Sequence, residues 1–131
     1  MNKRDPLYSF YNLVMNHMIE TKIGDFEENL MLIAGILGEE EAYAFRISKA
    51  FEERTGRSIS IGSVHSTLDR LETKGFVKSK LKNSTSQRGE RTKRIFSITA
   101  LGKRVLTESM EFKMELWKEY PAFAGKLSFT S

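Results

Sequence analysis

The chain has 131 residues, of which 40% are hydrophobic, and a formal net charge of +4, which suits one globular domain with a modest core. It has no cysteine, so disulfides and thiolate metal sites are excluded. The first residues lack the apolar core of a signal peptide, and the longest apolar run, residues 30–37, is too short to cross a bilayer. We therefore expect a soluble cytoplasmic protein with no membrane partner.

The N-terminal residues 1–23 predict a helical extension. Pro6 can open a first helical turn after Asp5 as the N-cap, and apolar side chains then recur on one face. These side chains are Leu7, Phe10, Tyr11, Val14 and Met18. We expect this stripe to pack either against its own domain or against the last helix of a partner chain.

Two further helices are predicted before residue 57. In residues 26–37 the apolar side chains share one face, and Gly38 can end that helix. Residues 39–54 begin with an acidic turn that suits a helix N-terminus, and Thr55 and Gly56 supply a stop. The buried face of this second helix is predicted to hold Tyr43, Ile47, Ala50 and Phe51.

Residues 60–74 predict a helix with two unlike faces, capped by Ser60 and closed at Lys74 and Gly75. One face has the spacing of a packed core and holds Ile61, Val64, Leu68 and Leu71. The other face holds Gly62, Ser63, Ser66, Asp69, Arg70 and Thr73. A face that only meets water would more often carry long Glu, Lys and Gln side chains, so the short ones indicate close approach of another molecule.

After Gly75 the hydrophobic period changes from 3.6 toward 2. Residues 76–81 and 93–98 predict two strands, and the polar, turn-rich residues 83–91 predict the tip of a hairpin between them. Residues 74–94 hold 8 Lys and Arg against 1 acidic residue, whereas residues 1–73 hold 8 against 12. Such a one-sided cluster favours a polyanionic partner, and the alternative is a solvated hairpin with no partner.

Thr99 can cap a last helix from Ala100 to about Glu119, which Pro121 follows. Two adjacent apolar stripes run along this helix and exceed what a small three-helix core needs. The residues that would need a covering partner are Met110, Phe112, Leu116 and Trp117. Such a stripe is typical of interface core, and alternatively Trp117 beside Met110 could line a cavity for a planar ligand.

The order helix, helix, helix, basic hairpin, helix is that of a winged helix-turn-helix domain, whose third helix enters the major groove of DNA. The expected fold class is therefore mainly α (α+β), with a DNA-binding domain at residues 24–99 and a C-terminal dimerisation helix and tail at residues 100–131. Short hydroxyl side chains would reach phosphates and base edges, and the basic hairpin would add salt-dependent affinity. The candidate DNA-binding residues are Ser60, Gly62, Ser63, His65, Ser66, Arg70, Lys78, Lys80, Arg88, Arg91 and Lys93.

Several of these candidates also have plainer interpretations. Ser63 can serve local capping, and His65 can be an exposed histidine with no role. Arg70 can form a surface ion pair with Asp69 or Glu72, and these two acids indicate that the later turns of the helix stay outside the groove. The arginines of the hairpin tip can simply face water.

The same residues resemble the PadR-like family of bacterial transcriptional regulators. The third helix of that family typically reads Gly-Thr-Leu-Tyr-Pro, then Leu, Arg-Leu-Glu and a closing Gly. The matching residues here are Gly62-Ser63-Val64-His65-Ser66, Leu68, Arg70-Leu71-Glu72 and Gly75, and residues 93–102 resemble the family's basic pair, two aromatics, Leu-Thr and Gly. Ile61, His65 and Ser66 stand where the family often has Pro, Tyr and Pro, so the family's base contacts do not carry over.

The resemblance spans about residues 26–106 and implies a homodimer formed through the last helix, with a planar aromatic effector in some members. A two-fold dimer would present its third helices to half-sites about 34–36 Å apart, so we expect a pseudo-palindromic operator. The predicted function is a sequence-specific transcriptional regulator, a repressor, with helix 60–74 in the major groove and hairpin 76–98 on the DNA backbone. The alternative is a winged-helix protein–protein interaction module whose basic hairpin docks an acidic partner.

Enzymatic and metal-dependent functions lack the residues they need. The only histidines are His17 and His65, and no Gly-rich phosphate loop follows a strand. His17 and Glu20 could share a helical face, but two weak ligands do not make a metal site. We therefore expect no catalytic residue, no metal and no cofactor.

Overall fold

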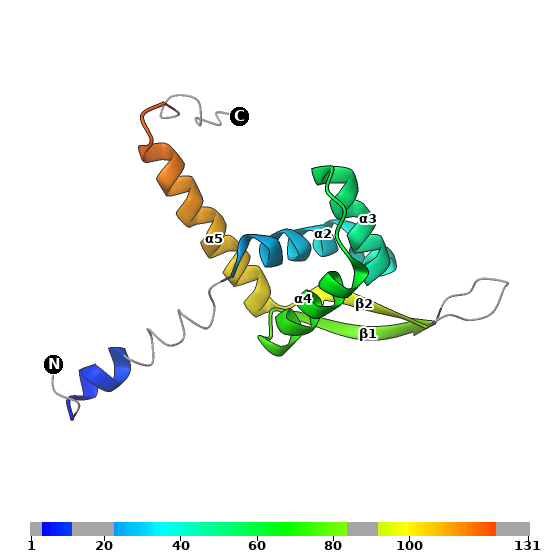
Figure 1. The fold of residues 1–131 in the computed structure, drawn as a ribbon. Helices are drawn as coiled ribbons and strands as arrows, with labels where there is room; N and C mark the ends of the chain where they lie inside the picture. Colours follow the sequence, from blue (N-terminus) through cyan, green and yellow to red (C-terminus); the bar gives the residue numbers. More distant parts are fainter. Residues whose placement is uncertain (1–3, 12–22, 84–91, 123–131) are drawn as a thin grey trace.

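The computed structural model describes residues 4–11, 23–83 and 92–122, and Figure 1 shows three helices gathered at the base of a long hairpin. The elements are α2 (Asp25–Glu41), α3 (Ala44–Thr55), α4 (Ile61–Thr73), β1 (Val77–Asn83), β2 (Thr92–Ile98) and α5 (Ala100–Glu119). Residues 6–11 are also helical. This order agrees with the predicted architecture of three helices, an antiparallel hairpin and a last helix.

The predicted start of the N-terminal helix is confirmed. The Asp5 side chain accepts a hydrogen bond from the Leu7 N–H at 2.9 Å, which satisfies one of the donors that the first turn leaves open. Leu7, Phe10 and Tyr11 are exposed, so the described residues provide no cover for this part of the stripe. The rest of the predicted stripe, Val14 and Met18, lies outside the described residues, as do His17 and Glu20.

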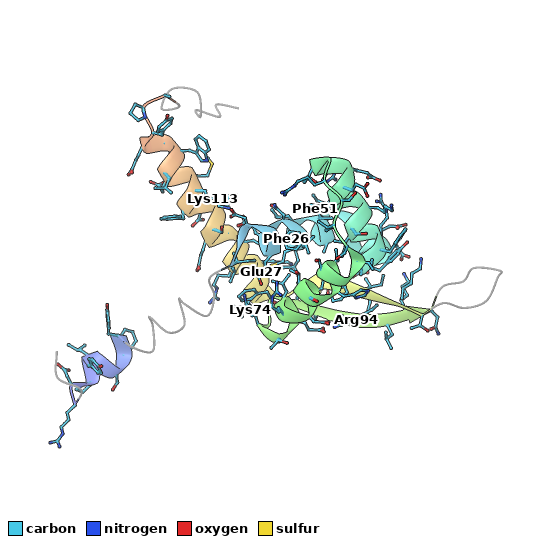
Figure 2. The ribbon with its side chains drawn as sticks, in the orientation of Figure 1. Phe26, Glu27, Phe51, Lys74, Arg94 and Lys113 are labelled. Atoms are coloured by element: carbon cyan, nitrogen blue, oxygen red, sulfur yellow. The ribbon has the colours of Figure 1, made fainter. Side chains whose placement is uncertain are left out.

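One apolar cluster joins the helices to the hairpin. The ring of Phe26 on α2 stands edge-on to that of Phe51 on α3, with 5.5 Å between the ring centroids (Figure 2). The largest fully buried side chains are Phe51, Phe76, Phe96, Leu30, Met31, Ile47, Leu68, Leu71, Val64 and Val77. Burial of such side chains stabilises the fold by about 25 cal/mol per Å² of apolar surface. The predicted apolar faces of residues 26–37 and of the following helix are therefore confirmed.

The predicted start of α3 at Glu39 is wrong, because α3 begins at Ala44. Gly38 leaves the helical conformation with φ 76°, as its predicted role as a stop requires, but residues 39–41 add one more turn to α2. Beyond that turn, the Ala42 carbonyl accepts a hydrogen bond from the Phe96 N–H of β2 at 2.8 Å. The chain between the two helices is thus bound to the hairpin, and the acidic run lies before this link.

The buried face of α4 also differs from its prediction by one position. Ile61 is 43% exposed, because it lies in the first turn directly after the Ser60 cap and outside the packed part of the helix. Thr67 is buried in its place, beside Val64 and Leu68. The packed face of α4 therefore begins one turn later than the apolar pattern indicates.

The hairpin, α4 and α5 meet at a tight junction. Gly75 has φ 83° and reverses the chain after α4, which is the conformation that favours glycine. Thr99 caps α5 as predicted, since its Oγ1 accepts a hydrogen bond from the Gly102 N–H at 3.0 Å. The same hydroxyl donates to the Gly75 carbonyl at 2.6 Å. One side chain therefore fixes both the exit from α4 and the entry into α5.

In the described part of the chain, no helix combines the length and the apolar character that crossing a bilayer would require. The same residues contain no group of three or more His, Cys, Asp or Glu side chains that could hold a metal ion.

We expect Gly102→Ala to destabilise the fold by about 2 to 3 kcal/mol. A Cβ at this position would lie 2.1 Å from the Phe76 carbonyl oxygen, which is backbone and cannot move away alone. The free energy of unfolding in urea would measure the effect. Gly62→Ala is the matched control, because its Cβ would meet only Ser60 Oγ at 4.0 Å, and alanine favours helix by up to about 1 kcal/mol. Equal stability of Gly102→Ala and wild type would contradict the tight junction.

Candidate nucleic-acid interface

The first half of α4 presents the predicted surface of short side chains. Ser60 caps the helix, with its Oγ accepting a hydrogen bond from the Ser63 N–H at 3.0 Å and donating one to Ser63 Oγ at 3.1 Å. Gly62, His65 and Ser66 are exposed on the following turns. A second molecule can therefore approach the backbone of these turns closely, and hydroxyl groups are there to donate and accept hydrogen bonds.

The second half of α4 is bound to the hairpin instead. Arg94 of β2 donates from Nη1 to Asp69 Oδ1 at 2.8 Å and from Nη2 to Glu72 Oε1. Its Nε donates to Ser79 Oγ at 2.9 Å, and that hydroxyl donates to the other oxygen of Glu72 at 2.7 Å. We call these four residues, Arg94, Asp69, Glu72 and Ser79, the Arg94 clamp. Figure 2 shows Arg94 beneath α4 on the hairpin.

The clamp favours the charged forms of Glu72 and Arg94. The hydrogen bond from Ser79, and next those from Arg94, hold the pKa of Glu72 below its usual range although burial opposes this. Hydrogen bonds to Asp69 and Glu72 raise the pKa of Arg94. Asp69 and Glu72 are therefore paired with Arg94. The alternative interpretation from the sequence had paired them with Arg70. Arg70 donates to Thr67 Oγ1 at 3.3 Å.

Lys74, at the C-terminal end of α4, is bound to α2. Its Nζ lies 3.0 Å from Glu27 Oε2, and both groups are visible at the α2–α4 contact in Figure 2. Burial raises the pKa of Glu27, but the hydrogen bonds from Lys74 and from the Gly24 N–H outweigh it and leave that pKa below the usual glutamate range. Lys74 thus holds α4 in place, and its charge is compensated within the fold.

Two more of the basic hairpin residues have partners within the fold. Lys82 Nζ lies 2.6 Å from Glu40 Oε2, at the end of α2. Lys93 Nζ lies 4.1 Å from the centroid of the Tyr43 ring, which is cation–π geometry. The local excess of basic residues is therefore smaller than the sequence count indicates, because acids distant in the chain fold back onto it.

Lys78 and Lys80 are the exposed basic residues of β1. They alternate with Ser79, so they project from the opposite side of the strand to the Arg94 clamp. The register pairs Lys82 with Lys93, which puts Lys93 on the same side as these two lysines. The alternation of side chains along a strand would have been enough to predict from the sequence that Lys78 and Lys80 lie on one side of the hairpin and Ser79 on the other. Arg88 and Arg91, predicted at its tip, lie outside the described residues.

The predicted residues of α5 lie on two different surfaces. Met110 and Trp117 line a groove of about 430 Å³ between α2 and α5, together with Leu32 and Leu106. The other two predicted residues, Phe112 and Leu116, are 66% and 52% exposed and are not part of that lining. The structure therefore brings together only half of the predicted set.

Sequence reasoning missed the polar contact that joins α5 to α2 beside this groove. Glu28 of α2 is buried, and its carboxylate accepts hydrogen bonds from Ser109 Oγ at 2.8 Å and from Lys113 Nζ at 3.0 Å. The hydrogen bond to Glu28 raises the pKa of Lys113. No short-range pattern could have paired residues this far apart in the chain.

Comparison with known proteins supplies a family and a fold. The sequence model of the transcriptional regulator PadR-like family matches residues 33–108, which is more than half of the chain. No curated protein matches the chain.

Solved structures with the same fold include three regulators of low sequence identity. RosR of H. salinarum, in the complex named hsRosR-S1, shares 21% identity over 82% of this chain and 88% of its own, with a TM-score of 0.60. A PadR family transcriptional regulator from Eggerthella lenta shares 22% identity over 94% of this chain and 98% of its own, with a TM-score of 0.51. Bacillus subtilis PadR in complex with operator DNA shares 21% identity over 68% of this chain and 48% of its own, with a TM-score of 0.52. The predicted winged helix-turn-helix fold class is thereby confirmed.

We expect Glu27→Gln to lower the stability by about 1 kcal/mol at pH 7, because Lys74 then loses its charged partner. The folded-state pKa of Glu27 is lowered, so its contribution is complete at neutral pH and is lost as the pH falls through that pKa. The difference from wild type should therefore shrink below about pH 4.3, the ordinary glutamate value. Urea unfolding between pH 7 and pH 3 would measure it. Glu115→Gln, which removes an exposed partner of Lys118, should leave the pH profile unchanged.

Proposed function

Because the chain belongs to the PadR-like family of transcriptional regulators, we propose that it is a sequence-specific DNA-binding repressor that acts as a homodimer. The family comprises regulators of transcription and not enzymes. The observation that carries the proposal is the first half of α4, which is capped, exposed and built from short side chains. In the proposal this half enters the major groove, and the hairpin, residues 76–98, follows the DNA backbone.

The proposed contacts follow from the chemistry of the exposed side chains. Ser63 and Ser66 can donate to and accept from base edges or phosphates, and His65 can donate to a phosphate or to guanine. Lys78 and Lys80 would neutralise phosphates and make the affinity fall with salt. Bacillus subtilis PadR, which has this fold, was solved in complex with operator DNA, and this supports a DNA duplex as the partner of the present chain.

The proposed homodimer is supported by the uncovered apolar surface of α5. This helix has 20 residues and extends away from the body in Figure 1. Phe112 and Leu116, one helical turn apart, are 66% and 52% exposed, and uncovered apolar side chains of this size are typical of an interface. A second α5 packed across a two-fold axis would cover them. The two copies of α4 would then face half-sites about 34–36 Å apart, which predicts a pseudo-palindromic operator.

The groove between α2 and α5 supports a second role, the binding of a planar aromatic effector. Trp117 offers a face for stacking, and Met110 can adapt its side chain to the shape of a ligand. A ligand held there would touch both the helix proposed for dimerisation and the body that carries α4. Effector binding would thus be able to change the separation of the two DNA-binding surfaces.

We expect Ser66→Glu to weaken binding to every duplex by about 10-fold or more, because it places a carboxylate among phosphates. Fluorescence anisotropy with duplexes from the promoter region of its own gene, measured at several salt concentrations, would test this. Asn29→Glu, at an exposed position of α2, is the matched control, with the same charge change away from α4 and outside the groove, and it should bind as wild type does. Wild-type protein that binds no duplex, at any salt, would refute the proposal and favour the acidic protein partner.

We expect the double variant Phe112→Glu, Leu116→Glu to be monomeric, because two carboxylates cannot be buried in an apolar interface without a large desolvation penalty. Sedimentation would report a halved mass at micromolar concentration. Leu81→Glu, at a still more exposed leucine on the hairpin, should leave the mass of the assembly unchanged. A double variant that sediments as wild type does would contradict dimerisation through this surface of α5.

A further inference from the structure

Arg94 occupies the joint between the helix proposed to read DNA and the hairpin proposed to follow its backbone. Its three guanidinium nitrogens each donate to a partner, two on α4 and one on β1. The guanidinium carbon also lies 4.7 Å from the centroid of the Phe96 ring. The planar guanidinium group is thereby hydrogen-bonded along its edge and packed against an aromatic ring on its face. Through this one side chain, β2 is joined to both α4 and β1.

The two strands do not place the hairpin by themselves, so its contacts with the helices matter. A two-stranded sheet alone is only marginally stable, and here no third full strand supports it in the described part of the chain. Val77 and Phe96 anchor its base in the core, whereas Leu81, two residues beyond Ser79, is 73% exposed. The Arg94 clamp lies at the point where the hairpin leaves the core and sets the hairpin on α4, while the Ala42–Phe96 hydrogen bond and the Lys82–Glu40 ion pair join it to the end of α2.

The clamp also determines the charge of the surface beside Ser66 and the other side chains of α4 that are proposed to contact DNA. Asp69 lies one helical turn after Ser66 on the exposed side of α4, and its side chain is 59% exposed. A carboxylate there would repel phosphates unless a cation stayed with it. Arg94 provides that cation from the next element of the fold, and it does the same for Glu72.

From these observations we propose that Arg94 is a positioning residue, which sets the hairpin on α4 and neutralises Asp69 and Glu72 without itself contacting the duplex. The proposal rests on the proposed DNA-binding function for its effect on affinity, but its effect on the hairpin is independent of DNA. Since the donors of Arg94 are already engaged by the two acids and Ser79, a phosphate would have to displace a charged partner to reach it.

The test is Arg94→Lys, which keeps the positive charge and removes the planar fork. We expect affinity for the specific duplex to fall about 10-fold, while the slope of log affinity against log salt stays that of wild type, because no phosphate contact is lost. Arg94→Gln should weaken binding further, and adding Asp69→Asn to it should restore part of that loss by removing the uncompensated charge. Arg46→Lys is the matched control, since Arg46 of α3 makes loose ion pairs, at 3.9 Å with Glu41 at the end of α2 and at 3.7 Å with Glu53.

Amide hydrogen exchange in the absence of DNA separates this proposal from the proposed function. Arg94→Lys should speed exchange in β1 and β2 about 10-fold and leave the core amides of α2 and α3 unchanged. If the hairpin loosens but wild type binds no duplex, the DNA-binding proposal fails and the positioning role stands. Unchanged exchange together with unchanged affinity would overturn the positioning role. A shallower salt slope for Arg94→Gln, by about one phosphate contact, would overturn it too by making Arg94 a DNA contact.

Discussion

The ion pairs of one guanidinium join the helix and the hairpin that carry the two exposed surfaces of this domain. Arg94 joins the second half of α4 to both strands, and the surfaces on either side of it are the short-chain face of α4 and the lysines of β1. Arg94 and Glu72 are each about one third exposed, so their attraction is screened less than in a pair on the open surface. A rigid joint of this kind presents two surfaces to a partner at once, whereas a loose hairpin would have to be ordered on binding.

The second constraint is the junction at Thr99 and Gly102, where α5 leaves the body. Gly102 packs so closely against the backbone of Phe76 that no side chain fits between them, and the Thr99 hydroxyl bonds to both sides of the turn. The direction of α5 is therefore determined at its first turn, and the contacts of Glu28 with Ser109 and Lys113 support it about two and three turns later. In the proposed dimer, this direction sets the distance between the two copies of α4, and a strained or loosened junction would change which half-site spacing fits.

Local patterns in the sequence were enough to predict the elements, their order and most of their ends. Caps such as Ser60 and Thr99 act within three residues, and the periods of 3.6 and 2 depend only on neighbouring residues, so both can be recognised without the fold. The start of α3 could not be recognised in this way, because it depends on the bond between Ala42 and Phe96 of a distant strand. The same limit applies to the candidate site. The basic residues of the hairpin region can be counted in the sequence, but their partners Glu27, Glu40 and Tyr43 come from distant parts of the chain and can be identified only in the fold.

The two stretches of sequence that carry the family resemblance meet in space at the Arg94 clamp. Glu72 belongs to the first stretch, Arg70-Leu71-Glu72, and Arg94 to the second, Lys93-Arg94, and the two side chains are hydrogen-bonded to each other. In this chain, the residues at these positions therefore hold the hairpin on α4. The positions where this chain departs from the family pattern, His65 and Ser66, are instead exposed on the first half of α4, away from that joint. In the proposed function, one helix therefore has two roles: its later turns hold the hairpin through Arg94, and its earlier turns contact the operator.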